Sequence, residues 1–147
     1  MKIERKMAAT ALFVALSAVG VVASAQTVRI ANQGDALSMD PHSLNETLQL
    51  SVTGNVYEPL VGRNKDLSVA PALATSWKQT SPTVWRFELR KGVQFHDGTP
   101  FTADDVVFSF GRMKGDGSDM KATNSDVKEV RKIDDHTVEI ETIAPQP

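Results

Sequence analysis

Apolar and polar residues alternate along two stretches in the second half of the chain. Over residues 83–90, one face collects Trp85, Phe87 and Leu89. Residues 137–142 alternate in the same way, after a second strand candidate and an Asp-Asp-His turn. A period of two places every second side chain on one face of a strand. We therefore expect a half-buried strand at 83–90 and a β-hairpin formed by residues 127–133 and 137–142.

Shorter strands are expected where a few apolar residues lie between turn residues. These segments are 28–31, 61–63 and 93–95. Asn64 and Asp66 favour a turn after the second of them, and Gly98 favours a turn after the third. The sequence thus predicts several short strands connected by tight turns.

A helix is predicted by apolar residues that recur every four positions. The four residues are Leu48, Val52, Val56 and Leu60. This spacing stacks side chains on one face of a helix. Gly54 should weaken the helix by about 1 kcal/mol relative to alanine, and Pro59 should end it.

A second helix should begin at Thr102, because Thr102 and Asp105 have the spacing of a capping box. Its apolar stripe is expected to contain Val106, Phe110 and Met113, widened by Val107 and Phe108. Residues 114–124 are polar and contain two glycines, which predicts a mobile loop. Strands and helices are mixed along the chain, so the expected fold class is mixed α/β (α+β).

The first 25 residues have the pattern of a secretory signal peptide. Lys2, Arg5 and Lys6 precede an apolar run over residues 7–22, and Ala23-Ser24-Ala25 forms a small-x-small cleavage site. A membrane anchor is the alternative, but the run is shorter than the ~20 residues that span a bilayer. We expect residues 1–25 to be removed on export.

Composition limits the possible functions further. The chain has 147 residues, no cysteine and a formal net charge of −2. The missing cysteines exclude a disulfide framework, a thiol nucleophile, a cysteine-ligated zinc and a lipid-modified cysteine. A basic excess that would favour nucleic acid is absent. An exported chain of this kind is expected in a bacterial periplasm.

Candidate catalytic and metal-binding residues are few. Asp104 and Asp105 are adjacent, so their side chains diverge on a helix and helix capping explains them better than acid–base chemistry. His42, His96 and His136 lack the close spacing of a metal site and each lies beside a turn residue. We predict no catalytic residue, no metal site and no cofactor.

Two further features could form a binding surface. The aromatic residues Trp77, Trp85 and Phe87 could line a pocket, although their strand spacing favours core packing. The polar loop over residues 40–48, which carries Asn45 and Glu46, is the better candidate for a binding loop.

Several segments resemble the family 5 bacterial extracellular solute-binding proteins. These proteins are the periplasmic peptide, dipeptide, glutathione and nickel receptors of ABC importers. The similar segments are NVYEPLV (55–61), PALATSW (71–77), WRFELRKGVQFHDGTPFTADDVV (85–107), MDPH (39–42) and DDHTV (134–138). The resemblance covers nearly all of residues 26–147.

The resemblance implies a type II periplasmic-binding-protein-like fold, of which this chain would be a part. Residues 26–60 would form the first segment of lobe I, and residues 61–147 a truncated small α+β subdomain. The receptor is expected to be a monomer that takes up a small peptide or related solute and delivers it to an inner-membrane ABC permease. Residue-wise matching places Asn45, Glu46 and Thr47 in a ligand-contacting loop. Asn45 stands where peptide receptors can carry a carboxylate.

Two alternative functions remain open from the residues alone. An exported small hydrolase would use the paired carboxylates of Asp104 and Asp105. A stand-alone periplasmic interaction domain would fold cooperatively as residues 26–147 without any further chain.

Overall fold

The structure is a computed structural model, and it describes residues 27, 29 and 31–146. The predicted signal peptide lies outside the described residues, as do residues 28 and 30 of the predicted first strand. All the elements below belong to one compact unit that begins at Asn32. The predicted division between a lobe segment and a subdomain at residue 60 stays a prediction.

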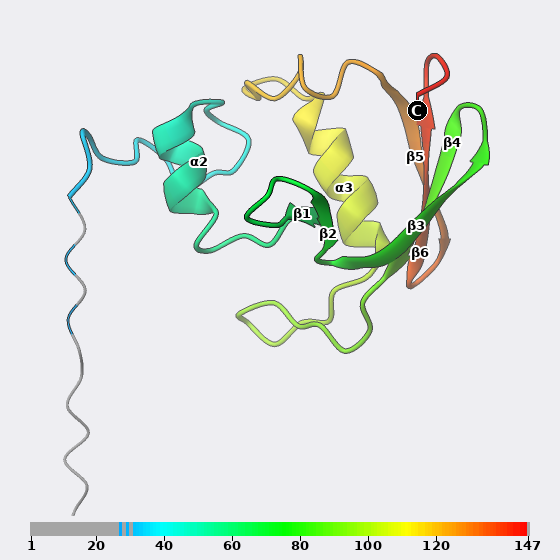
Figure 1. Ribbon diagram of the computed structural model, residues 1–147, viewed down its shortest axis with the longest axis horizontal. Helices are drawn as coiled ribbons and strands as arrows, with labels where there is room; N and C mark the ends of the chain where they lie inside the picture. Colours follow the sequence, from blue (N-terminus) through cyan, green and yellow to red (C-terminus); the bar gives the residue numbers. More distant parts are fainter. Residues whose placement is uncertain (1–26, 28, 30, 147) are drawn as a thin grey trace, which may run out of the picture. The chain divides into compact units, whose positions relative to one another are not determined.

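Two helices and six strands lie within the described part of the chain (Figure 1). The helices are α2 (Thr47–Thr53) and α3 (Ala103–Met113). The strands are β1 (Val61–Arg63), β2 (Val69–Pro71), β3 (Ala74–Ser81), β4 (Val84–Leu89), β5 (Val127–Asp134) and β6 (Thr137–Thr142).

The larger sheet is antiparallel with the strand order β3-β4-β6-β5, and β1 and β2 form a separate hairpin. β6 pairs with both β4 and β5, so the predicted hairpin over residues 127–142 is confirmed. Helix α3 connects β4 to β5 and packs against β5 and β6 (Figure 1). The fold class is mixed α/β, as the sequence predicted.

The core lies between α3 and the sheet. Its buried members are Ala74, Leu89, Phe101, Ala103, Val106 and Val138. Trp77 and Phe87 pack against this cluster with their ring centroids 6.4 Å apart. These two aromatic residues therefore contribute to packing, as their strand spacing indicated.

Strand β3 was not expected from the sequence. Most of its side chains are polar and exposed, and only Ala74 is fully buried. Ala74 and Trp77 are the residues of β3 that reach the core, and a register shift between Ala74 and Ser76 separates them by three positions. The sequence of β3 therefore lacks the period-two apolar alternation of β4.

The helix predicted from apolar residues at every fourth position is longer than α2, and the face that it was expected to bury is not the one that α2 buries. Helix α2 ends at Thr53, and Val56 beyond it is 45% exposed. Gln49 and Thr53 are the buried residues of α2. Gln49 Nε2 donates to the Ser38 carbonyl, and Thr53 Oγ1 donates to the Gln49 carbonyl at 2.9 Å. These bonds satisfy Gln49 Nε2 and Thr53 Oγ1 on the inner face, while Gln49 Oε1 is buried there without a partner.

Helix α3 begins as predicted, with the capping box of Thr102 and Asp105. The Asp105 carboxylate accepts from the Thr102 backbone N–H at 2.8 Å. The prediction that Phe108 belongs to the buried stripe is wrong, because its side chain is 71% exposed. Two positions along a helix turn by about 200°, so Phe108 faces away from the buried Val106.

Two other local predictions need correction. The expected strand at 93–95 is reduced to a single bridge between Gln94 and Pro100. The segment over residues 114–124, expected to be a mobile polar loop, buries Met120 and Asn124. Asn124 Nδ2 donates to the Phe110 carbonyl at 3.2 Å, which ties this segment to α3.

Candidate functional site

The candidate ligand contacts lie together at the start of α2. Glu46 is the N-cap residue of this helix, in an extended conformation, and Thr47 is its first residue. Asn45, Glu46 and Thr47 are all exposed. The Glu46 side chain makes no capping hydrogen bond. Its carboxylate is therefore not committed to stabilising the helix, and the three side chains present polar groups to solvent.

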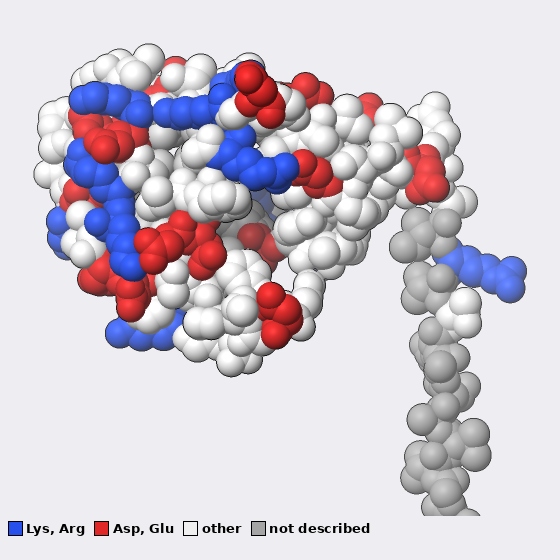
Figure 2. Space-filling model, turned by 180° about the vertical axis from the view of Figure 1, so that it is seen from behind, with Lys and Arg blue, Asp and Glu red and all other residues white. Residues whose placement is uncertain are grey.

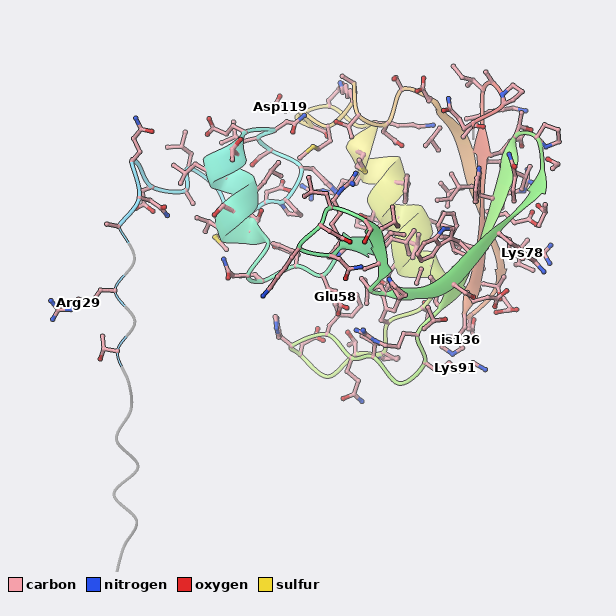
Figure 3. The ribbon with its side chains drawn as sticks, in the orientation of Figure 1. Arg29, Glu58, Lys78, Lys91, Asp119 and His136 are labelled. Carbon is pink, nitrogen blue, oxygen red and sulfur yellow. The ribbon has the colours of Figure 1, made fainter. Side chains whose placement is uncertain are left out.

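A second segment, residues 114–126, lies beside this loop. The Asp119 backbone N–H donates to the His42 carbonyl at 2.9 Å, and Asn45 Nδ2 donates to Thr123 Oγ1 at 3.4 Å. Asp119 is labelled on this segment in Figure 3, close to the start of α2. We call the surface formed by residues 40–47 and 114–126 the two-loop surface. It brings together polar groups that are more than 70 residues apart in the sequence.

The base of the loop over residues 40–47 is organised by Asp40. One carboxylate oxygen of Asp40 accepts from the His42 backbone N–H at 2.9 Å. The Ser43 hydroxyl donates to the Asp40 carbonyl, also at 2.9 Å. Such side-chain and main-chain bonds are the usual way in which Asp and Ser fix a turn. Pro41 follows Asp40 and disfavours helical backbone angles there.

Arg112, in the last turn of α3, binds this same carboxylate through two guanidinium nitrogens. Nη1 donates to Asp40 Oδ1 at 2.8 Å, and Nη2 donates to Oδ2. The hydrogen bonds from Arg112, and then the one from the His42 backbone, lower the pKa of Asp40 to about 2. Partial burial lowers the pKa of His42, and the nearby Arg112 charge adds to this effect. Asp40 is therefore charged, and His42 neutral, at neutral pH.

Sequence reasoning missed the Arg112–Asp40 pair. A basic residue in the last turn of a helix is favoured by the helix dipole alone, and nothing local points to a partner 72 positions earlier. The segment over residues 39–42 was predicted to resemble the family, but no partner for Asp40 was predicted.

A separate concave region lies between the chain leading to β1 and the turn that precedes α3. It has a volume of about 310 Å³, and its lining is mainly apolar, including Tyr57, Phe95 and Phe101. Its carboxylate, Glu58, is paired with Arg90 through contacts of 2.9 and 2.6 Å. Glu58 is labelled in Figure 3. This pocket therefore offers apolar contact surface, while its carboxylate is already neutralised.

The paired carboxylates of α3 have separate structural partners. Asp105 caps its own helix, whereas Asp104 Oδ2 accepts from Lys132 Nζ at 2.7 Å. The pKa of Lys132 is raised, chiefly by this bond to Asp104 and then by the bond to Asp135. The two carboxylates do not converge on a common point, so the geometry offers no acid–base pair.

Charges on the sheet are mixed rather than segregated. Figure 2 shows Lys and Arg interleaved with Asp and Glu on the side that carries the sheet. Arg86 Nη2 lies 2.7 Å from Glu139 Oε1, and Arg131 and Lys128 contact Glu141 at 2.9 and 2.6 Å. A surface of alternating sign does not provide the continuous basic track that a phosphate backbone requires.

The described residues also limit what else the chain can hold. Neither helix in this part of the chain has the length and apolar character that crossing a bilayer requires. Over the same residues, no three His, Cys, Asp or Glu side chains are grouped closely enough to bind a metal ion.

One protein family and several individual proteins are similar to this chain. The family of bacterial extracellular solute-binding proteins, family 5, matches residues 68–147 through its middle part. The periplasmic oligopeptide-binding protein OppA of Escherichia coli is 30% identical over 86% of this chain and 27% of its own length.

Solved structures of two more proteins have the same fold over this region. NikZ from Campylobacter jejuni, in complex with Ni(L-His), has a TM-score of 0.69 and 27% identity, covering 78% of this chain and 23% of NikZ. The ABC transporter-associated periplasmic binding protein DppA from Helicobacter pylori, in complex with the peptide STSA, has a TM-score of 0.65 and 31% identity, covering 76% of this chain and 26% of DppA.

The chain spans only about a quarter of the length of these relatives. Within that span, the matching family covers the sheet and α3, and the solved structures share the mixed α/β fold of type II periplasmic binding proteins. The chain belongs to the family 5 bacterial extracellular solute-binding proteins.

Proposed function

We propose that this protein is the periplasmic substrate-binding component of an ABC importer. It captures a small peptide or a similar small solute and delivers it to an inner-membrane permease, and it performs no covalent chemistry. The observation that carries this proposal is the family match over residues 68–147. The names of the relatives, an oligopeptide-binding protein and a peptide-bound DppA among them, support peptides as the first solutes to test.

The two-loop surface suggests how this part of the protein takes part in binding. Periplasmic binding proteins enclose their ligands by hinge closure between lobes, so contacts from one loop need only complete a site that other parts form. Glu46 would accept hydrogen bonds from an ammonium group, and Asn45 can both donate and accept.

The structural roles of Asp104 and Asp105 favour this proposal over an exported hydrolase. A hydrolase that uses paired carboxylates needs both on one reacting bond, whereas here one caps α3 and the other contacts Lys132. The proposal therefore places function in reversible binding.

Isothermal titration of the complete encoded protein tests the proposal directly. We expect one solute from a panel of Ala-Ala, Ala-Ala-Ala, Ala-Ala-Ala-Ala, glutathione and nickel with histidine to bind with a Kd of about 1 μM or tighter. The signal peptide should be removed before measurement. Absence of binding heat with every member of the panel would contradict the proposed function.

Removing the polar side chains of the loop should weaken binding without unfolding the protein. We expect Asn45→Ala combined with Glu46→Ala to raise the Kd of the bound solute by about tenfold. Both side chains are exposed, and Glu46 makes no side-chain capping bond. Thermal unfolding should therefore change little. Lys78→Ala, exposed on β3 (Figure 3), is the control that should leave Kd unchanged. An equal effect of both variants would contradict the assignment of this loop.

A further inference from the structure

The Arg112–Asp40 pair is the charged connection between α3 and the loop that carries the candidate ligand contacts. Two guanidinium nitrogens of Arg112 bind the two carboxylate oxygens of Asp40. Arg112 Nη1 also lies 3.5 Å from the His42 ring nitrogen Nδ1. Two parallel bonds fix the orientation of the carboxylate as well as its distance, which a single bond does not.

The backbone of Arg112 is held in place by the packing of α3 on the sheet. It lies in the last turn of α3, whose inner face packs on the sheet through the buried Val106. The residue two positions earlier, Phe110, packs against the same core, and its carbonyl accepts from Asn124. The backbone of Arg112 therefore has a fixed position relative to the sheet, and only its side chain can rotate.

Asp40 fixes the conformation of the loop that follows it through two hydrogen bonds. Its carboxylate accepts from the His42 N–H, and its carbonyl accepts from the Ser43 hydroxyl. The His42 carbonyl in turn accepts from Asp119 of the neighbouring segment. Two residues after Ser43 the chain reaches Asn45, which contacts Thr123. The contacts of Asp40 thus constrain the part of the two-loop surface that carries Asn45.

We propose that Arg112 is a positioning residue of the ligand site, which holds the loop over residues 40–47 in its binding geometry through Asp40. This inference rests on the proposed function, because it assigns Arg112 a role in the same binding event. Arg112 need not touch the solute. Arg112 orders the loop before binding, so that Asn45, Glu46 and Thr47 lose less conformational entropy when the solute binds.

An ordinary surface ion pair is the competing explanation. Both side chains are partly exposed, and such pairs contribute little to global stability. The two explanations differ in what a loss of Arg112 changes. A positioning residue alters local order in the loop and affinity, whereas an ordinary surface pair alters neither.

The test compares Arg112→Gln with Arg90→Gln in the complete protein. Arg90 is the matched control, because it forms a similarly exposed two-bond pair with Glu58 outside the two-loop surface. Two quantities are measured. The first is hydrogen exchange of the His42, Ser43 and Asp119 amides, whose hydrogen bonds hold the loop. The second is the Kd for Ala-Ala-Ala, or for whichever panel member binds the wild type. Arg112→Lys keeps the charge without the two parallel bonds and leaves the Asp40 carboxylate free to accept from the His42 N–H.

For Arg112→Gln we expect loop amides to exchange about tenfold faster and Kd to rise about tenfold, with sheet amides unchanged. Arg90→Gln should leave both quantities unchanged, and Arg112→Lys should change both by less than Arg112→Gln does. Unchanged exchange, faster exchange with unchanged Kd, or equal acceleration of the sheet amides would each overturn the proposal. If no panel member binds the wild type, the proposed function fails. Faster exchange confined to the His42, Ser43 and Asp119 amides would then still support the ordering of the loop by Arg112.

Discussion

Replacing Phe101 by alanine is expected to lower the free energy of unfolding by about 3–5 kcal/mol, the usual cost of removing a buried aromatic ring. Phe101 is 6% exposed and belongs to the core cluster at the entry to α3. Its ring meets Phe95 edge-on, with centroids 6.1 Å apart. Truncation would leave a cavity between the turn at 91–101 and the sheet. Urea denaturation of the complete protein measures the loss.

Phe108→Ala is the matched control for this prediction. It makes the same chemical change seven residues later, on α3, at a side chain that is 71% exposed. Its effect should stay within about 0.5 kcal/mol. Phe101→Leu should lower the free energy of unfolding by less than Phe101→Ala does. It replaces the alanine variant in the comparison if that variant does not fold. Similar losses for Phe101→Ala and Phe108→Ala would contradict the assignment of the core.

The two phenylalanines also show where sequence patterns succeed and where they do not. The helical spacing of Val106 and Phe110 correctly predicted the inner face of α3. Phe108 was included because it is apolar, although its angular position on the helix places it on the outer face. Phe101 precedes the helix, in a segment without any period, so only the three-dimensional structure shows that it is buried.

Strands were predictable where apolar and charged residues alternate in the sequence. β4 and β6 have this alternation, which located them within one residue at each end, although both faces of each strand are at least partly buried. β3 is an exposed edge strand, and α2 turns hydrogen-bonded Gln49 and Thr53 inward. In both elements the tertiary environment, rather than local hydrophobicity, determines which residues are buried.

The candidate site was likewise predictable only in part. Asn45, Glu46 and Thr47 were indicated by a polar loop and by resemblance to the family. Their surroundings, Thr123 beside Asn45 and the support from Arg112, depend on contacts across 70 or more residues. Such contacts follow from the way α3 packs on the sheet, and no short motif encodes them.

A second large effect is expected in the centre of the sheet, where Val138→Thr should destabilise the protein by about 1–3 kcal/mol. Val138 is fully buried on β6, opposite Phe87 of β4 and Lys132 of β5. Threonine has nearly the same shape as valine, so the change adds a hydroxyl group without creating a cavity. The backbone groups of β6 are already paired with two neighbouring strands. The new hydroxyl therefore loses its hydration and gains little in exchange.

Val69→Thr separates this desolvation effect from any effect of threonine on strands in general. Val69 lies on β2 and is 54% exposed, so a hydroxyl group there remains hydrated. Threonine is also a favourable strand residue, and the free energy of unfolding should change by no more than about 0.5 kcal/mol. Chemical denaturation of both variants measures the difference. Equal losses would show that strand propensity, and not burial at the centre of the sheet, determines the cost.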